Sequence, residues 1–437
     1  MDPLVVGYLG VGLLFLFLAT GVPVGVAMGA VAIVGMLLGA GEAMAFGQLR
    51  TLPFAVVNNY AFAVLPMFVL MGTMAEASAL TTEVFAAADL WLRRVRGGLY
   101  QAVIVGSAIF AAVSGSTIVN AVVFTRIAFP QMVRFGYSKS LSIGAIAGAG
   151  SFAAMIPPSI TMVIYAIMTE QSVGQLLIAG VIPGILTAIV YLGGVALMVR
   201  LKPSLAPVIH EAVPWRARWR ASGRIWPIAL LMAVVLGGIY SGMFPPSAAG
   251  AAGAFGAFCL ALSRKRTVKG WLIASLKDAA SISCVIFVIL IGGLLLSRML
   301  AVVGVIDNMV LVITSLASTP IRFMIFASVL YIVLGCFLDT TSMMVVTLPF
   351  VFPVVVKLGI DPIWFGIILV KLIEISVVTP PVGINLFAVM GAVGREATFG
   401  DVVAGVIPFI LFDLIVLALL IAFPEIATWL PQQMIAD

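Results

Sequence analysis

The stretch Met155-Ile156-Pro157-Pro158-Ser159-Ile160 interrupts a long apolar run with a double proline, and the same break recurs at Pro380-Pro381. The two breaks are 223 residues apart (380 − 157). Two further motifs recur with them: Pro130-x3-Arg134-x-Gly136 as Pro353-x3-Lys357-x-Gly359, and Ala179–Pro183 as Ala404–Pro408. Corresponding helix breaks in two halves of an apolar chain are typical of transporters that bind substrate and ions at mid-membrane. The sequence therefore predicts an internal duplication with one broken helix in each half.

The composition is that of a membrane protein. Of 437 residues, 63% are hydrophobic and 9% are charged, against roughly half and a quarter in soluble proteins. About 20 uncharged residues suffice for one helical crossing of a bilayer. Several stretches reach that length without Asp, Glu, Lys or Arg: Pro3–Gly41, Thr51–Ala75, Gly97–Thr125, Ser140–Thr169, Gln171–Val199 and Ile225–Ser263. We predict an all-α, multi-pass protein of the lipid bilayer.

Several functions are disfavoured by the sequence. The net charge of +6 comes from basic loops between spans, which cytoplasmic loops carry in any case, so no nucleic-acid partner is expected. The chain lacks GxxxxGK[ST], HExxH and GxSxG motifs, and its one histidine, His210, lies in a hydrophilic loop. An enzyme is not expected. The three cysteines have no pairing or metal-ligand spacing, and we expect them to be buried: Cys259, Cys284 and Cys336.

The basic loops indicate how the chain crosses the membrane. Two long uncharged runs, Pro3–Gly41 and Ile225–Ser263, each predict two helices joined by a turn. Basic residues on both sides of Gly97–Thr125 place both of its ends in the cytoplasm, which a single crossing cannot satisfy. A re-entrant hairpin with its tip at Ser114–Thr117 does satisfy it. The duplication predicts a second hairpin over Phe323–Phe352, which opens from the outer face if the halves are inverted.

These hairpins divide the chain into five segments. The expected scaffold comprises 1–96 and 226–320, and a basic cytoplasmic loop covers 200–225. Each transport repeat contains one hairpin and one broken helix, at 97–199 and 321–437.

The helix breaks expose backbone groups that suit ion and substrate binding. Free carbonyls and hydroxyls favour a small dehydrated cation, and half-helix N-termini favour an anion. One cation site is expected at Ser114, Gly115, Ser116, Asn120 and Pro157, and a second at Asp339, Thr341, Thr379, Pro380 and Gly383. Substrate is expected between them, at Thr117, Ser159, Thr340, Ser342 and Asn385.

Three ionisable residues are expected at membrane depth, where each costs about 2.5–3.5 kcal/mol unless it is paired or hydrated. Lys371 and Glu374 are spaced to neutralise each other on one helix. Asp339, at the tip of the second hairpin, is the better candidate for an ion ligand. Gly144-x3-Gly148 is interpreted as a helix-packing surface.

The motifs resemble the large membrane subunit of tripartite ATP-independent periplasmic (TRAP) transporters over essentially the whole chain. In the first half the resemblance rests on Ser114-Gly115-Ser116, Arg126-x3-Pro130-Gln131-Met132-x3-Gly136-Tyr137, Ile156–Ile160 and Ala179–Gly184. In the second half it rests on Leu338-Asp339-x-Thr341, Leu358–Ile368 and Glu374–Phe387. The chain departs from the family at Lys371 and Ser376, where small or apolar residues are expected, and at Thr340, where proline is usual.

The resemblance implies a sodium-driven importer of organic acids, such as a C4-dicarboxylate or sialic acid, in the bacterial inner membrane. It implies an elevator motion of the two repeats against the scaffold, with Na⁺ as the coupling ion. The family's ion-binding elements fall on Ser114, Gly115, Ser116 and Pro157, and on Asp339, Thr379, Pro380 and Gly383. The implied partners are a small four-helix membrane subunit, expected as a separate chain, and a periplasmic substrate-binding protein.

Two alternatives stay open. Asp339 and Glu374 are each able to carry a proton, which leaves a proton-coupled organic-anion carrier. An anion channel would move substrate without regard to a sodium gradient. An intramembrane enzyme has little support, because Lys371 and Glu374 are the only pair of catalytic type at membrane depth.

Overall fold

The computed structural model describes residues 2–434 except 79, 210, 212, 265–267, 336 and 382; the side chains of 268, 269 and 395 are also outside it. His210, Cys336 and part of the third basic loop therefore lie outside the described residues. Everything described is helix or connection. The all-α prediction is confirmed.

The helices follow the predicted segments. The N-terminal helices are α1 (Pro3–Ala19), α2 (Val24–Gly39), α3 (Glu42–Val57), α4 (Val64–Ala77) and α5 (Leu80–Leu92). The first repeat contains α6 (Gly98–Ser114), α7 (Thr117–Arg134), α8 (Lys139–Gly150), α9 (Phe152–Met155), α10 (Ile160–Met168), α11 (Val173–Ala179) and α12 (Val181–Leu201). Next come α13 (Trp215–Tyr240), α14 (Pro246–Arg264), α15 (Val268–Val302) and α16 (Val305–Leu316). The second repeat contains α17 (Pro320–Leu334), α18 (Thr340–Lys357), α19 (Pro362–Val378), α20 (Ile384–Val393), α21 (Phe399–Ala422) and α22 (Glu425–Gln432). Short 3-10 turns lie at Tyr60–Ala63, Pro203–Leu205 and Gly394–Glu396.

The double prolines break the helices where the sequence predicts. Helix α9 ends at Met155 and α10 begins at Ile160, while α19 ends at Val378 and α20 begins at Ile384. Proline lacks the backbone donor and clashes with the preceding turn, so neither helix continues through the pair. Both proline–proline peptide bonds are cis.

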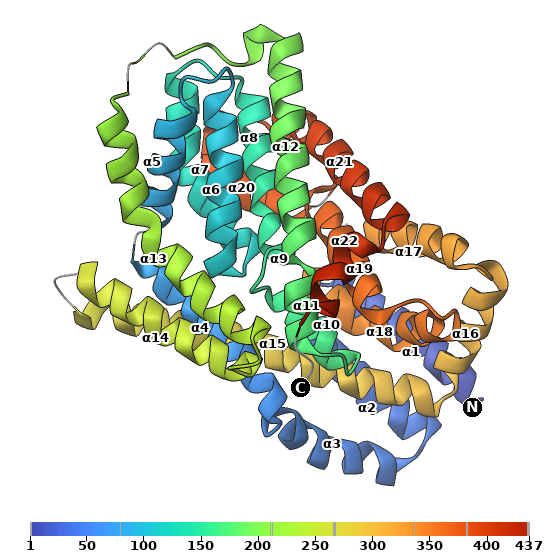
Figure 1. The fold of residues 1–437 in the computed structure, drawn as a ribbon. Coiled ribbons are helices and arrows are strands. Elements are labelled where there is room, and N and C mark those ends of the chain that lie inside the picture. The colour runs from blue at the N-terminus through green and yellow to red at the C-terminus, as the bar shows by residue number, and fades with distance from the viewer. Residues whose placement is uncertain are drawn as a thin grey trace.

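Both predicted hairpins form as helix–turn–helix units. Helices α6 and α7 reverse direction at Gly115 and pack against each other in the bundle that also holds α8 and α12 (Figure 1). Helices α17 and α18 are joined through residues 335–339, and the hydroxyls of Tyr331 and Thr347 hydrogen bond at 2.6 Å between them. Re-entry into a bilayer stays a prediction.

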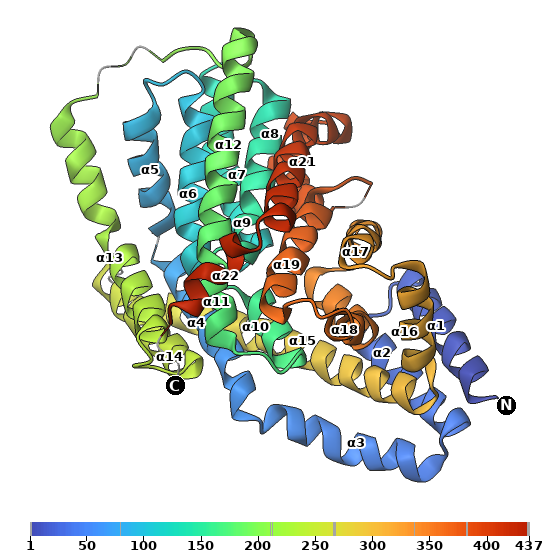
Figure 2. The ribbon, with the colours of Figure 1, turned by 45° about the vertical axis from the view of Figure 1, so that its right-hand side comes forward.

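Helix α15, the longest, packs along α2 and α4, and α14 packs on α4 and α13. Figure 2 shows α15 passing beneath the bundle toward α16 and α1. By length and composition, eight helical segments of the described chain suffice to cross a bilayer, and α16 with α17, bent by 116°, would make a ninth. The prediction of a multi-pass protein is confirmed.

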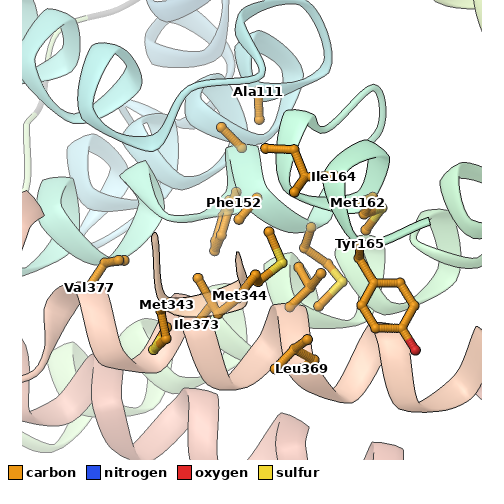
Figure 3. Packing of buried hydrophobic residues seen from close by; sticks show 14 of the residues in the cluster. Ala111, Phe152, Met162, Ile164, Tyr165, Met343, Met344, Leu369, Ile373 and Val377 are labelled. Atoms are coloured by element: carbon orange, nitrogen blue, oxygen red, sulfur yellow. The ribbon is translucent and has the colours of Figure 1, made fainter. Parts of the chain in front are cut away.

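The core lies where the two repeats meet. Figure 3 shows Phe152 and Ile164 of the first repeat beside Met343, Met344 and Ile373 of the second. These five side chains are all 0–1% exposed. Dense packing between the repeats fixes the helix breaks on either side of it.

The cysteine prediction is wrong for the two cysteines described. Cys259 on α14 and Cys284 on α15 are both exposed on the isolated chain. Apolar residues on the outer face of a membrane protein contact lipid, so an apolar neighbourhood does not imply burial in protein.

Candidate functional site

One cavity of about 580 Å³ brings the two predicted sites together. Its walls include both hairpin tips, residues 114–119 and 339–341, and the first turns of α10 and α20. The opposite wall is formed by α4 and α15. The predicted residues on its lining are Ser114, Gly115, Ser116, Thr117, Asp339, Thr340, Thr341 and Asn385.

Four helix N-termini converge on this cavity. The first residues of α7, α10, α18 and α20 all line it: Thr117, Ile160, Thr340 and Ile384. A helix N-terminus presents free backbone N–H groups and about half a positive charge. The arrangement therefore favours an anion at the centre of the molecule.

The first hairpin tip touches the first helix break. Gly115 ends α6 in the left-handed region, φ +60°, and a Cβ there would lie 3.2 Å from the Pro158 carbonyl oxygen. The Ser116 hydroxyl caps α7 by accepting from the Val119 amide at 3.4 Å. Ser114 is 7% exposed and its hydroxyl has no hydrogen-bond partner among the described residues. That oxygen is available to a ligand.

The second tip uses its carboxylate differently. Asp339 Oδ2 accepts from the Thr341 and Ser342 amides at 3.1 and 3.3 Å, and Oδ1 accepts from the Ser342 hydroxyl. Asp339 is therefore the N-cap of α18. Its charge is partly balanced by those backbone donors before any ion binds.

The other predicted residues lie behind the lining. These are Asn120, Pro157, Ser159, Ser342, Thr379, Pro380 and Gly383. Asn120 donates to the Ser107 carbonyl oxygen at 3.3 Å, and Ser159 caps α10 by accepting from the Met162 amide at 3.4 Å. Thr379 donates to the Ile375 carbonyl oxygen at 2.5 Å. Gly383 precedes α20 at φ +51°, a conformation that glycine adopts readily.

Sequence reasoning missed the wall formed by α4 and α15. Glu76 and Thr73 on α4, and Asp278 and Ser281 on α15, all line the cavity. The tip is close to α4, since a Cβ on Gly72 would lie 2.8 Å from the Ser114 carbonyl oxygen. Glu76 ends an uncharged run, which was the available signal, but no sequence motif connects it to the hairpins.

A buried ionic cluster lies in the second repeat. Lys371 Nζ donates to Glu374 Oε2 at 2.8 Å and to Asp413 Oδ1 at 2.6 Å. Tyr191 donates to Asp413 Oδ2 at 2.8 Å. The Lys371–Glu374 pair is confirmed, but Asp413 was missed as a third charge, although it is the sole charge between Val402 and Pro424. Lys371, Glu374 and Asp413 are each 0% exposed.

Comparison with known proteins gives the family. The family model described as "Tripartite ATP-independent periplasmic transporter, DctM component" matches residues 11–426. The chain belongs to this family. It is the large permease subunit of a tripartite transporter, as the first-half and second-half motifs indicated.

Curated relatives of this permease differ in substrate. The C4-dicarboxylate TRAP transporter large permease of Pseudomonas aeruginosa is 31% identical, with 87% of this chain and 88% of the relative covered. The sialic acid large permease of Vibrio cholerae is 27% identical, with 96% of each chain covered. The ectoine large permease of Halomonas elongata is 28% identical, with 96% of each covered.

A solved structure has the same fold. The crystal structure of the Alcanivorax borkumensis YdaH transporter aligns with a TM-score of 0.60 and 16% identity, covering 98% of both chains. At that identity the likeness concerns the fold alone.

Asn385 of the permease offers a test that separates binding from folding. It is 0% exposed, it lines the cavity, and neither polar atom of its side chain has a partner among the described residues. A buried unsatisfied amide costs about 1–3 kcal/mol. We expect Asn385→Ala to keep the unfolding temperature within a few degrees while substrate uptake falls about tenfold. Thermal unfolding and uptake, with Asn58→Ala on the exposed end of α3 as control, check this. A variant with normal uptake would contradict a binding role.

Proposed function

We propose that this permease imports an organic acid by sodium symport. The observation that carries the proposal is the cavity on which four helix N-termini and both hairpin tips meet. Helix N-termini suit a carboxylate, and the hydroxyls and carbonyls of the tips suit Na⁺. The names of the relatives, C4-dicarboxylate, sialic acid and ectoine, all denote carboxylate compounds.

The two cation sites proposed here are those predicted from the sequence. Ser114 and Gly115 with the Pro157–Pro158 backbone would form the first, supported by the contact of Gly115 with the Pro158 carbonyl. The second would use Asp339 and the backbone near Thr379 and Gly383. Substrate would bind between them against Thr117, Thr340 and Asn385, which line the cavity.

The motion we propose is an elevator. Residues 97–199 and 321–437 would move as one transport unit against 1–96 and 226–320, with 200–225 as a cytoplasmic loop. The cavity lies at the contact between these two sets of helices, since α4 and α15 form one of its walls. Displacement there would expose the cavity to the two sides of the inner membrane in turn.

The proposed partners are a small membrane subunit, packed on the scaffold helices, and a periplasmic binding protein that delivers substrate. The tripartite family description and the relative named DctMQ support a multi-component assembly.

Uptake in proteoliposomes tests the sodium coupling. The chain would be reconstituted with its small subunit and offered labelled organic acids through the periplasmic protein, under an inward sodium gradient or matched potassium. We expect accumulation only with sodium, and about a tenfold loss in Ser116→Ala and in Asp339→Asn, because each removes an oxygen or a charge at a tip. Asp307→Asn, outside the cavity on α16, is the control.

Equal uptake in both salts would contradict sodium symport. Accumulation driven by a pH gradient alone would favour the proton-coupled carrier, which the carboxylates of Glu76, Asp278 and Asp339 on the lining also allow. Downhill flux without any gradient dependence would indicate an anion channel.

A further inference from the structure

The charges on the cavity lining are unusual for a site that takes an anion. Three carboxylates line it, those of Glu76, Asp278 and Asp339. Among the described lining residues there is no lysine, arginine or histidine. Asp339 caps α18, so its charge is offset by the amides of Thr341 and Ser342. Glu76 and Asp278 have no such partners.

Glu76 and Asp278 form an acid pair on the wall opposite the hairpin tips. They lie on α4 and α15, both side chains are exposed, and each acts electrostatically on the other. Neither forms an ion pair with a cation in the part of the chain that the structure describes. Arg126 on α7 acts electrostatically on Glu76 but does not line the cavity. The pair therefore presents negative charge to whatever the cavity holds.

The opposite wall has the reverse polarity. The N-termini of α7, α10, α18 and α20 direct partial positive charge toward the cavity. Two buried polar side chains without partners stand among them: the hydroxyl of Ser114 and the amide of Asn385, 7% and 0% exposed. These groups lack hydrogen-bond partners that a bound ligand would supply. The cavity thus has an anion-binding wall and a cation-binding wall.

Between the two walls the lining is mainly apolar. Val69, Ile282, Val285, Ile286, Ile289 and Val377 contribute most of this surface. A volume of about 580 Å³ is within the range of small-molecule sites. It suits a compound with an aliphatic body and a charge at each side.

We propose that the substrate is a zwitterion: one carboxylate held at the helix N-termini, a cationic nitrogen held by Glu76 and Asp278, and an apolar body between them. The proposal rests on the proposed function, since it names the substrate class of that same site. A dicarboxylate of similar length would place its second carboxylate beside the acid pair, where like charges repel. An uncharged group there would leave both carboxylates without a partner.

Ligand binding to the full chain in lipid nanodiscs tests this with three probes: L-leucine, 4-methylpentanoate, which is leucine without the amino group, and succinate. Binding is measured by thermal stabilisation in sodium chloride. We expect an apparent affinity for leucine about tenfold or more above that for the other two. In the double variant Glu76→Gln, Asp278→Asn we expect leucine to lose this advantage and succinate to bind at least as well as leucine. Glu42→Gln and Asp307→Asn, which remove carboxylates outside the cavity, should keep the wild-type order.

Three outcomes overturn the inference: succinate binding as tightly as leucine to the wild type, a leucine preference that survives in the double variant, and no stabilisation by any probe. Each leaves the proposed function to the uptake experiment, which asks only for sodium dependence. Conversely, a leucine preference that disappears in the double variant supports the inference even where uptake proves independent of sodium.

Discussion

Replacing Lys371 with methionine is expected to prevent the permease from folding stably. Methionine has a similar length but no charge, so Glu374 and Asp413 would be left as two carboxylates, each 0% exposed, without their shared cation. Removing one partner of a buried ion pair costs about 3–5 kcal/mol, a large part of the stability of most proteins. We expect low yield in the membrane, or an unfolding temperature in detergent that is lower by ten degrees or more, as an order of magnitude.

Compensating variants test that charge is the cause. In Lys371→Met with Asp413→Asn and Glu374→Gln the buried charges are gone, and much of the lost stability should return. Lys357→Met, at the exposed end of α18, removes a lysine without touching the cluster and should behave as wild type. A Lys371→Met protein as stable as the Lys357→Met control would show that the cluster does not hold α19 to α21.

The second large effect is expected at a contact between two glycines. Helices α8 and α21 meet backbone to backbone: a Cβ on Gly144 would overlap the Gly405 carbonyl oxygen, and a Cβ on Gly405 would overlap that of Ser140. Backbone atoms on both sides leave little room to adjust. We expect Gly144→Leu to separate the helices, reduce the folded yield severely and abolish uptake, as measured by size-exclusion profile and transport.

Gly193 on α12 provides the matched control, because a Cβ there meets nothing within 4 Å. Gly193→Ala replaces a helix-interior glycine with the best helix former, and is expected to leave stability unchanged or raise it by up to about 1 kcal/mol. Normal folding of Gly144→Leu would mean that the two helices do not pack as closely as described.

Local chemistry made much of the fold predictable. Proline pairs end helices through covalent geometry, so the breaks at Pro157 and Pro380 follow from sequence alone. The hairpin tip at Gly115 was predictable from the charge on either side of it and the small polar residues at its centre. Both signals act over a few residues and do not depend on what packs against them.

The missed residues depend on tertiary packing. Glu76 and Asp278 are about two hundred positions apart, and only the packing of α15 on α4 brings them to one cavity. Asp413 meets Lys371 across two helices, and the i, i+3 spacing of Lys371 and Glu374 gave no indication of that third charge. The apolar neighbours of Cys259 were lipid-facing, which a one-dimensional pattern cannot distinguish from buried.

The glycine contact between α8 and α21 has a consequence for the working cycle. Helix α8 belongs to the first repeat and α21 to the second, and the Ser140 hydroxyl adds a hydrogen bond to the Asp401 carbonyl oxygen at 2.6 Å along the same seam. Sliding one helix past the other by a single residue would bring side chains where only hydrogen atoms fit. The two repeats are thus locked in one register, and opening to either face of the membrane has to be taken up as hinge motion in the connections that leave them.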